Sequence, residues 1–194
     1  GNGTGESWEN AINELADALR FAKAHENHWT ATEPMQIWVA ADTYTPTDKL
    51  GAKDTYGSFT QSRDITFLLP KNVKIYGGFA GTETNLSERN WHTNRTILSG
   101  DIGTKNSKND NVFHVVTAID DIGVSELNGF IITDGNAVQD PMYGGSTEVV
   151  IGSYHITRNK GAALHFHNAS PRVENCIITQ NGMYDGGAIF NNAT

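Results

Sequence analysis

Three charged residues in the second half of the sequence come closest to a set that could break a polysaccharide chain. A lyase for acidic polysaccharides needs several carboxylates to hold Ca²⁺ against the substrate, and a lysine or arginine to take the proton beside the substrate carboxylate. Asp134, Arg158 and Lys160 offer a base but only one carboxylate. A surface charge pair between Asp134 and Arg158 is the simpler interpretation, so these residues are weak catalytic candidates.

Hydrolysis of a glycosidic bond would instead need two or three aspartates on adjacent strands, one as the acid and the others to activate water. The candidates by position are Asp101, Asp120, Asp121 and Asp134. Asp120 and Asp121 stand shortly before a glycine, which is typical of a turn. The sequence therefore supports no complete catalytic set.

Two groups of residues could bind a ligand without catalysis. Trp91 and His92, with Arg95 nearby, could form a platform on which a sugar ring stacks, or Trp91 could hold its loop against the body of the protein. His165 and His167 lie two residues apart, so a strand would direct both to one face. They could share a metal ion, but no third ligand is evident, and a plain polar outer face is the simpler interpretation.

The segment 101–111 has a composition that could surround a calcium ion. Asp101 and Asp110 stand at its two ends, among other oxygen-bearing side chains. The spacing differs from that of an EF-hand loop, and Lys105 and Lys108 oppose a cation. We therefore expect a solvated loop, and no cofactor apart from the calcium ion that it could hold.

The elements that must position these residues are one helix and many short strands. After Ser7, apolar residues recur every three or four positions, which predicts an amphipathic helix over 7–25 with Ser7 as its N-cap. Polar segments at 41–64, 80–95 and 103–111 are expected to be excursions. Short apolar runs bounded by turn residues predict strands at 36–40, 65–69, 73–76, 96–99 and 112–116.

Two phrases recur in the last third of the chain. The first is written at 129–136, 153–159 and 175–181, and the second at 161–169 and 186–194. Alternation along a strand would send Ile132, Ile156 and Ile178, spaced 24 and 22 residues apart, into the interior and His155 outward. The asparagine near the end of each copy would stack in one column at a turn, a structural role, and these residues are Asn136, Asn159 and Asn181.

A period of 22–25 residues made of short strands predicts an all-β fold, a right-handed parallel β-helix whose coils pair at about 4.8 Å. We expect a single domain over 1–194, with the capping helix at 7–25, irregular coils with long loops over 36–118 and regular repeats over 125–194. The second phrase stops at Thr194, inside a repeat. The expectation is a truncated solenoid, or end-to-end self-association through an open last coil.

Composition narrows the partners. Fourteen Lys and Arg against 22 Asp and Glu leave a formal net charge of −8, so nucleic acid is not expected as a partner. No apolar run approaches the roughly 20 residues of a membrane-spanning helix. The single cysteine, Cys176, cannot form an internal disulfide and is expected to be a small buried hydrophobe.

The chain resembles the right-handed parallel β-helix proteins of the pectate-lyase-like superfamily, in particular large secreted or surface proteins of Bacteroidetes. Gly186-Gly187-Ala188-Ile189 is also similar to the repeat of chlamydial polymorphic outer-membrane proteins, although their partner motif, Phe-x-x-Asn, is replaced by Ile178-Thr179-Gln180-Asn181. The resemblance implies an exported protein that faces glycans or acts in adhesion. It is carried by GESWENA at 5–11, IWVAADTY at 37–44, VKIYGGFAGTET at 73–84, RNW at 89–91 and TILSGDI at 96–102.

Three functions remain open at this point. A strong scaffold without a convergent catalytic set favours a non-catalytic, adhesin-type module, secreted or on the outer cell surface, that binds a polysaccharide or a cell-surface glycan. The first alternative is a polysaccharide lyase or glycoside hydrolase, which would depend on residues such as Asp134 and Arg158. The second is a purely structural stalk or passenger domain.

Overall fold

The computed structural model describes residues 2–48, 62–138, 147–151, 153–183 and 187–192. This part of the chain is mostly β-structure, with one α-helix, α1 (Leu15–Ala24). Four 3-10 helices accompany it: η1 (Trp8–Asn10), η2 (Glu26–His28), η3 (Ser62–Asp64) and η4 (Leu86–Glu88). No helix in the described ranges is both long and apolar enough to cross a membrane.

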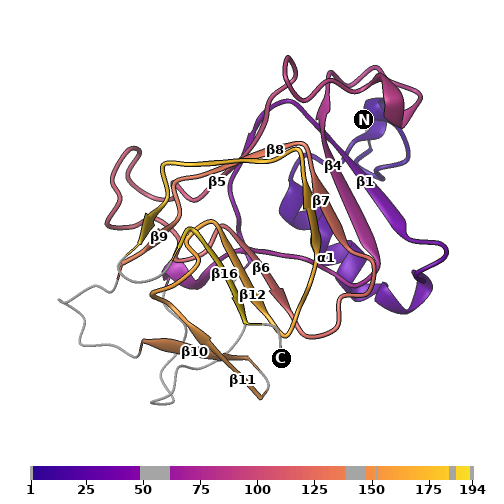
Figure 1. Cartoon of the computed structure of the whole chain (residues 1–194). Coiled ribbons are helices and arrows are strands. Elements are labelled where there is room, and N and C mark those ends of the chain that lie inside the picture. Colours follow the sequence, from indigo (N-terminus) through magenta and orange to yellow (C-terminus); the bar gives the residue numbers. More distant parts are fainter. Residues whose placement is uncertain (1, 49–61, 139–146, 152, 184–186, 193–194) are drawn as a thin grey trace.

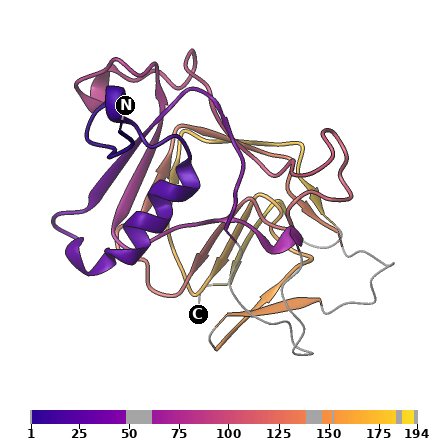
Figure 2. The same ribbon diagram turned by 180° about the vertical axis from the view of Figure 1, so that it is seen from behind.

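Most strands belong to three parallel sheets, which the chain visits in the same order again and again (Figures 1 and 2). Sheet 1 consists of β1 (Met35–Ala40), β4 (Val73–Phe79), β7 (Glu126–Asn128) and β13 (Arg172–Glu174). Sheet 2 consists of β2 (Thr43–Tyr44), β5 (Thr96–Ser99), β8 (Phe130–Thr133) and β14 (Ile177–Thr179). Sheet 3 consists of β3 (Phe67–Leu68), β6 (Val116–Ile119), β12 (Leu164–His167) and β16 (Ile189–Asn192).

Two smaller pairs complete the strand list. The strands β9 (Asn136–Ala137) and β15 (Gly182–Met183) are parallel, as in the three large sheets. The strands β10 (Glu148–Ile151) and β11 (Tyr154–Thr157) instead form an antiparallel hairpin. This hairpin is an insertion between β9 and β12, outside the repeating order of the sheets.

The strand registers test the predicted repeats directly. Ile132 of β8 stands opposite Ile178 of β14, and Leu164 of β12 stands opposite Ile189 of β16, 25 residues later. The first and third copies of the first phrase are therefore stacked as predicted. The second phrase is stacked too, although Gly186, Ala193 and Thr194 lie outside the described residues.

The middle copy of the first phrase is a correction. Residues 153–159 were expected to stack between the other two copies, but β11 pairs with β10 instead. Ile156 is buried as expected, yet against Val149 in a cluster separate from the main core. Local antiparallel pairing satisfies the backbone of this segment without a place in sheet 2.

The predicted asparagine column is also wrong. The register sets Gly182 opposite Asn136, so Asn181 falls opposite Gly135 and not opposite another asparagine. Asn181 accepts a hydrogen bond from the Gly135 N–H and donates to the carbonyl of Ile132. Asn159 follows the hairpin. The asparagines thus satisfy backbone groups one by one instead of forming a ladder.

The helix begins later than predicted. Ser7 caps the short η1, where its Oγ accepts from the Asn10 N–H, and α1 starts at Leu15. Trp8 explains the break, because its indole N–H donates to the Glu83 carbonyl and its ring packs against Phe79. A continuous helix from residue 7 could not meet both demands.

Two predicted strands are also shorter than expected. Of 65–69 only Phe67–Leu68 belongs to the ladder, and of 112–116 only Val116 does. The Val112 N–H bonds to the Gly100 carbonyl, whereas the Phe113 N–H bonds to the Arg63 carbonyl. This run therefore changes partners at each step, although its apolar side chains are buried. The predicted excursion 41–64 lies partly outside the described residues.

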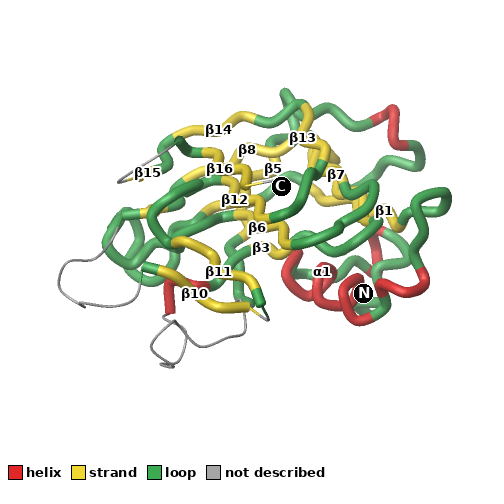
Figure 3. Tube along the Cα trace, turned by 60° about the horizontal axis from the view of Figure 1, so that its bottom comes forward, coloured by secondary structure: helices red, strands yellow, loops and turns green. Residues whose placement is uncertain are grey.

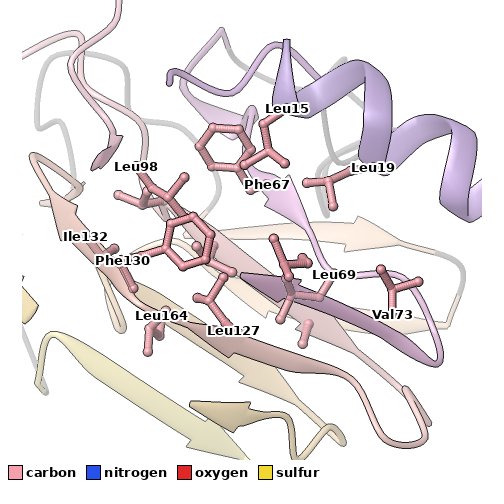
Figure 4. Packing of buried hydrophobic residues seen from close by; sticks show 14 of the residues in the cluster. Leu15, Leu19, Phe67, Leu69, Val73, Leu98, Leu127, Phe130, Ile132 and Leu164 are labelled. Carbon is pink, nitrogen blue, oxygen red and sulfur yellow. The ribbon is translucent and has the colours of Figure 1, made fainter. Parts of the chain in front are cut away.

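The main core lies between the three sheets and beneath α1. Figure 4 shows Leu15 and Leu19 of α1 facing the same interior as Phe67, Leu98 and Phe130. The helix contacts β1 and β3, so it covers the first-formed end of the stack. Cys176, expected to be buried, is only half-buried and packs against this core.

Gly135 lies at the closest approach between consecutive turns of the chain. A Cβ at this position would stand 2.0 Å from the Ala162 carbonyl oxygen, which is backbone and cannot swing away. We expect Gly135→Ala to lower the free energy of unfolding by about 1–3 kcal/mol, the usual cost of overpacking, as measured by urea denaturation. Gly187→Ala is the control, because its nearest atom, the Ile189 carbonyl oxygen, is 3.3 Å away. Equal losses in both variants would contradict this account.

Candidate functional site

The β10–β11 hairpin packs on the outer face of sheet 3. Val149 and Ile156 of the hairpin contact Leu68 and Ile119, which point outward from β3 and β6. Figures 1 and 3 both show the hairpin beside this sheet. The inserted hairpin therefore converts part of a flat sheet face into a walled surface.

A pocket of about 330 Å³ opens between the hairpin and the late strands of sheet 3. Its walls come from three segments: the hairpin with the turn after it, β12 and β16. The lining is mainly polar and carries one aromatic ring. The lining residues are Glu148, His155, Thr157, Asn159, Lys160, His165, His167, Phe190 and Asn192.

The hairpin wall presents a paired acid and imidazole. His155 is exposed, as alternation along its strand predicted, and its Nδ1 lies 3.1 Å from a carboxylate oxygen of Glu148. The Thr157 hydroxyl donates to the Asn159 side-chain carbonyl. These groups can donate to and accept from the hydroxyl groups of a ligand.

The opposite wall presents an aromatic ring and a cation. Phe190 is half-buried, and the ammonium of Lys160 lies 5.4 Å from the centroid of its ring. His167 is half-buried, with its ring edge-on to Tyr154 at 5.5 Å. A ligand in this pocket would meet one apolar ring face among several polar groups.

His165 is a correction to the predicted outer polar face. It is fully buried, its Nδ1 bonds to the Lys160 carbonyl at 3.1 Å, and its ring lies 4.5 Å from His114 and 5.0 Å from Phe190. Stacking of Phe190 from the next strand covers the position that alternation would leave open. Because His165 is enclosed and His167 is not, the two imidazoles do not form one exposed pair.

Both buried histidines are held neutral. Burial lowers the pKa of His114 to about 4, although its hydrogen bond to the Gly161 carbonyl acts in the opposite direction. Burial, followed by the nearby His114, lowers the pKa of His165 to about 3. Neither Nε2 atom has a hydrogen-bond partner in the described part of the chain. These rings therefore have a structural environment that only the neutral form tolerates.

The expected pair of Asp134 and Arg158 does not form. Arg158 is 2% exposed, and its guanidinium donates to both carboxylate oxygens of Asp64, at 2.8 and 2.6 Å. Asp134 accepts from the Ser99 hydroxyl at 3.3 Å. Asp134, Arg158 and Lys160 therefore lie in three different surroundings, and their proposed lyase set is not assembled.

Arg63 extends this buried charge network. It donates to the carbonyls of Asn111 and Asn136, both at 2.6 Å. Its guanidinium lies 4.1 Å from the centroid of Phe113, and that of Arg158 lies 5.6 Å away. The network ties η3 to the turn that follows the hairpin. No repeat or spacing in the sequence points to Asp64 as the partner of Arg158.

The paired aspartates form a turn, as predicted. Asp121 accepts from the Gly123 N–H at 2.9 Å and pairs with Lys71 at 2.5 Å. Asp120 has a φ of 66°, a turn conformation that aspartate tolerates. The contacts of both residues are those of a surface turn.

Trp91 holds its loop against sheet 1. Its backbone packs so closely on Gly78 that a Cβ there would lie 2.7 Å from the Trp91 nitrogen. Arg89 stacks over the Trp91 ring at 4.8 Å and donates to the Gly77 carbonyl. His92 and Arg95 remain exposed beside it. The anchoring role fits these contacts better than an open sugar platform.

No metal cluster is formed among the residues that the structure describes, if a cluster means three or more His, Cys, Asp or Glu side chains placed to hold one ion. Asp101 and Asp110 lie at opposite ends of the loop that follows β5. Comparison with known proteins adds no assignment, because no family model, curated protein or solved structure matches the chain.

Proposed function

We propose that the three sheets are the faces of a right-handed parallel β-helix, and that this scaffold presents a glycan-binding pocket outside the cell or on its surface. The repeating order of sheets 1, 2 and 3 supports the first part, since a coiling chain would produce it. Crossovers between parallel strands are right-handed in almost all proteins, which supports the hand. The likeness to exported β-helix proteins supports the location.

The pocket beside the hairpin is the observation that carries the binding function. A sugar offers hydroxyl groups around a ring with apolar C–H faces, so its site needs many polar groups and an aromatic surface. Glu148, His155 and Asn159 supply the polar groups, and Phe190 supplies the ring. The pocket is open on one side, which suits a chain or a branch better than an enclosed small molecule.

The composition of the lining favours binding over hydrolysis. Glycoside hydrolases of the common type place two carboxyl groups on opposite sides of the scissile bond. Glu148 is the single carboxylate among the described lining residues, and its neighbour is His155. A ligand held here would therefore be bound without the second acid that cleavage requires.

Phe190→Ala should weaken glycan binding by roughly three- to tenfold, the value of one aromatic contact of about 0.5–1.5 kcal/mol. Binding would be measured by calorimetry with an oligosaccharide chosen from a glycan array. Phe21→Ala is the matched control, because Phe21 is 48% exposed on α1, away from the pocket. Absence of any glycan binding at millimolar concentration, or equal losses in both variants, would contradict the proposal.

A further inference from the structure

The loop between β5 and β6 is closed at its base and folded on itself. The Gly100 carbonyl accepts hydrogen bonds from both the Ile102 and the Val112 N–H, at 3.0 Å each. Figure 1 shows this segment projecting beyond the end of β5, near β9. We call residues 100–112 the β5–β6 loop.

Carboxylates from the two ends of the β5–β6 loop reach into the same interior. Asp101 Oδ2 accepts from the Asn106 N–H at 3.0 Å, and Asp110 Oδ2 accepts from the Thr104 N–H at 2.7 Å. Each aspartate thus uses one oxygen to hold the loop backbone. The backbone hydrogen bond from Thr104 lowers the pKa of Asp110, so this group is ionised at neutral pH.

The second oxygen of each carboxylate has no partner. Asp101 Oδ1 and Asp110 Oδ1 are shielded from solvent and accept no hydrogen bond from any described residue. Asn111, which is 2% exposed, shows the same feature. Its amide nitrogen donates to the Asp134 carbonyl at 2.7 Å, whereas its Oδ1 is unpartnered. Buried oxygens without donors are costly, and one loop contains three of them.

We propose that the β5–β6 loop binds one calcium ion through Asp101 Oδ1, Asp110 Oδ1 and Asn111 Oδ1. Calcium takes carboxylate and amide oxygens in a flexible geometry, and backbone carbonyls or solvent can complete its shell of six to eight ligands. This set has two carboxylates and an amide, so it differs from a cluster of three acids or histidines. The site is separate from the pocket beside the hairpin.

The two lysines of the loop do not oppose this site as their sequence positions suggested. Lys105 and Lys108 are both exposed, so solvent screens their charge. The Lys108 carbonyl accepts from the Asn136 amide at 2.6 Å, which fixes the backbone there without its ammonium group. An ion with only oxygen ligands, and with two formal negative charges among them, favours calcium over a softer metal such as zinc.

Calorimetry of the chelator-treated protein with calcium chloride tests the proposal. We expect one calcium per chain with a dissociation constant of roughly 0.1–1 mM, the range of extracellular calcium modules. Asp101→Asn and Asp110→Asn should each abolish the binding heat. Asp17→Asn, an exposed aspartate paired with Arg20 on α1, should retain it. No binding heat at millimolar calcium, or undiminished binding in both loop variants, would overturn the proposal.

Proteolysis of the unaltered protein gives a local readout that remains valid if the loop variants fail to fold. Lysyl endopeptidase would cleave after Lys105 and Lys108, and the products would be identified by mass spectrometry. At a calcium concentration ten times the dissociation constant, cleavage in the loop should slow about tenfold. Cleavage after Lys23, on α1, is the internal control. An unchanged ratio of loop to control cleavage would overturn the proposal.

Discussion

Asp64→Ala is expected to lower the free energy of unfolding by about 3–5 kcal/mol, because it leaves the guanidinium of Arg158 buried without its carboxylate. The two side chains are only 1% and 3% exposed, so solvent cannot replace the lost partner. Urea denaturation followed by circular dichroism would measure the change. The stacking of Arg158 near Phe113 does not compensate, since a ring face neutralises no charge.

Asp121→Ala is the matched control for this ion pair. Asp121 and Lys71 are also joined by a short contact, but their side chains are 70% and 42% exposed. An exposed pair contributes about 0–1 kcal/mol, so its loss should be small. The double variant Asp64→Leu/Arg158→Met should recover part of the loss by removing both charges. A small effect of Asp64→Ala alone would show that Arg158 is not isolated by the change.

Acidification from pH 6.5 to about pH 4 is expected to remove several kcal/mol of stability through His114 and His165. Their pKa values are about 4 and about 3 in the folded protein, and about 6.5 in an unfolded chain. Below pH 6.5 the unfolded state therefore binds more protons, so stability falls as the pH falls toward the folded pKa values. Above pH 6.5 both states are neutral, and this contribution is fully present.

The double variant His114→Phe/His165→Phe isolates this effect from that of the carboxylates. Its free energy of unfolding, measured by urea denaturation at several pH values, should depend less steeply on pH between 6.5 and 4. His92→Phe replaces an exposed imidazole and should leave the slope unchanged. If the double variant keeps the slope of the unaltered protein, the buried pair does not control acid stability.

The strand pattern was largely predictable because alternation and repetition are local. The column of Ile132 and Ile178 and that of Leu164 and Ile189 follow from phrases that recur with similar spacing. The role of residues 153–159 was not predictable in this way. Their sequence fits a stacked strand, but Val149 offers a nearer partner, and a hairpin closes at a smaller cost in chain entropy.

The site was predictable only in part, because its walls come from segments that do not repeat together. His167 and Lys160 were singled out from the sequence, whereas Glu148 lies in an inserted strand with no copy elsewhere. Phe190 could have been found, since it stands 25 residues after His165 in the repeated second phrase. Burial of His165 depends on the rings above it, which no pattern within β12 contains.

The order of strands within the sheets bears on how the chain folds as it is made. After the first round, each new strand pairs with one already synthesised: β4 with β1, β5 with β2, β6 with β3, and later strands likewise. Ribosomes extend a chain by about 5–20 residues per second, slowly compared with the pairing of one short strand. A nascent chain can therefore settle onto a finished template turn by turn, beginning beside α1, and no later strand waits for a partner still to be translated.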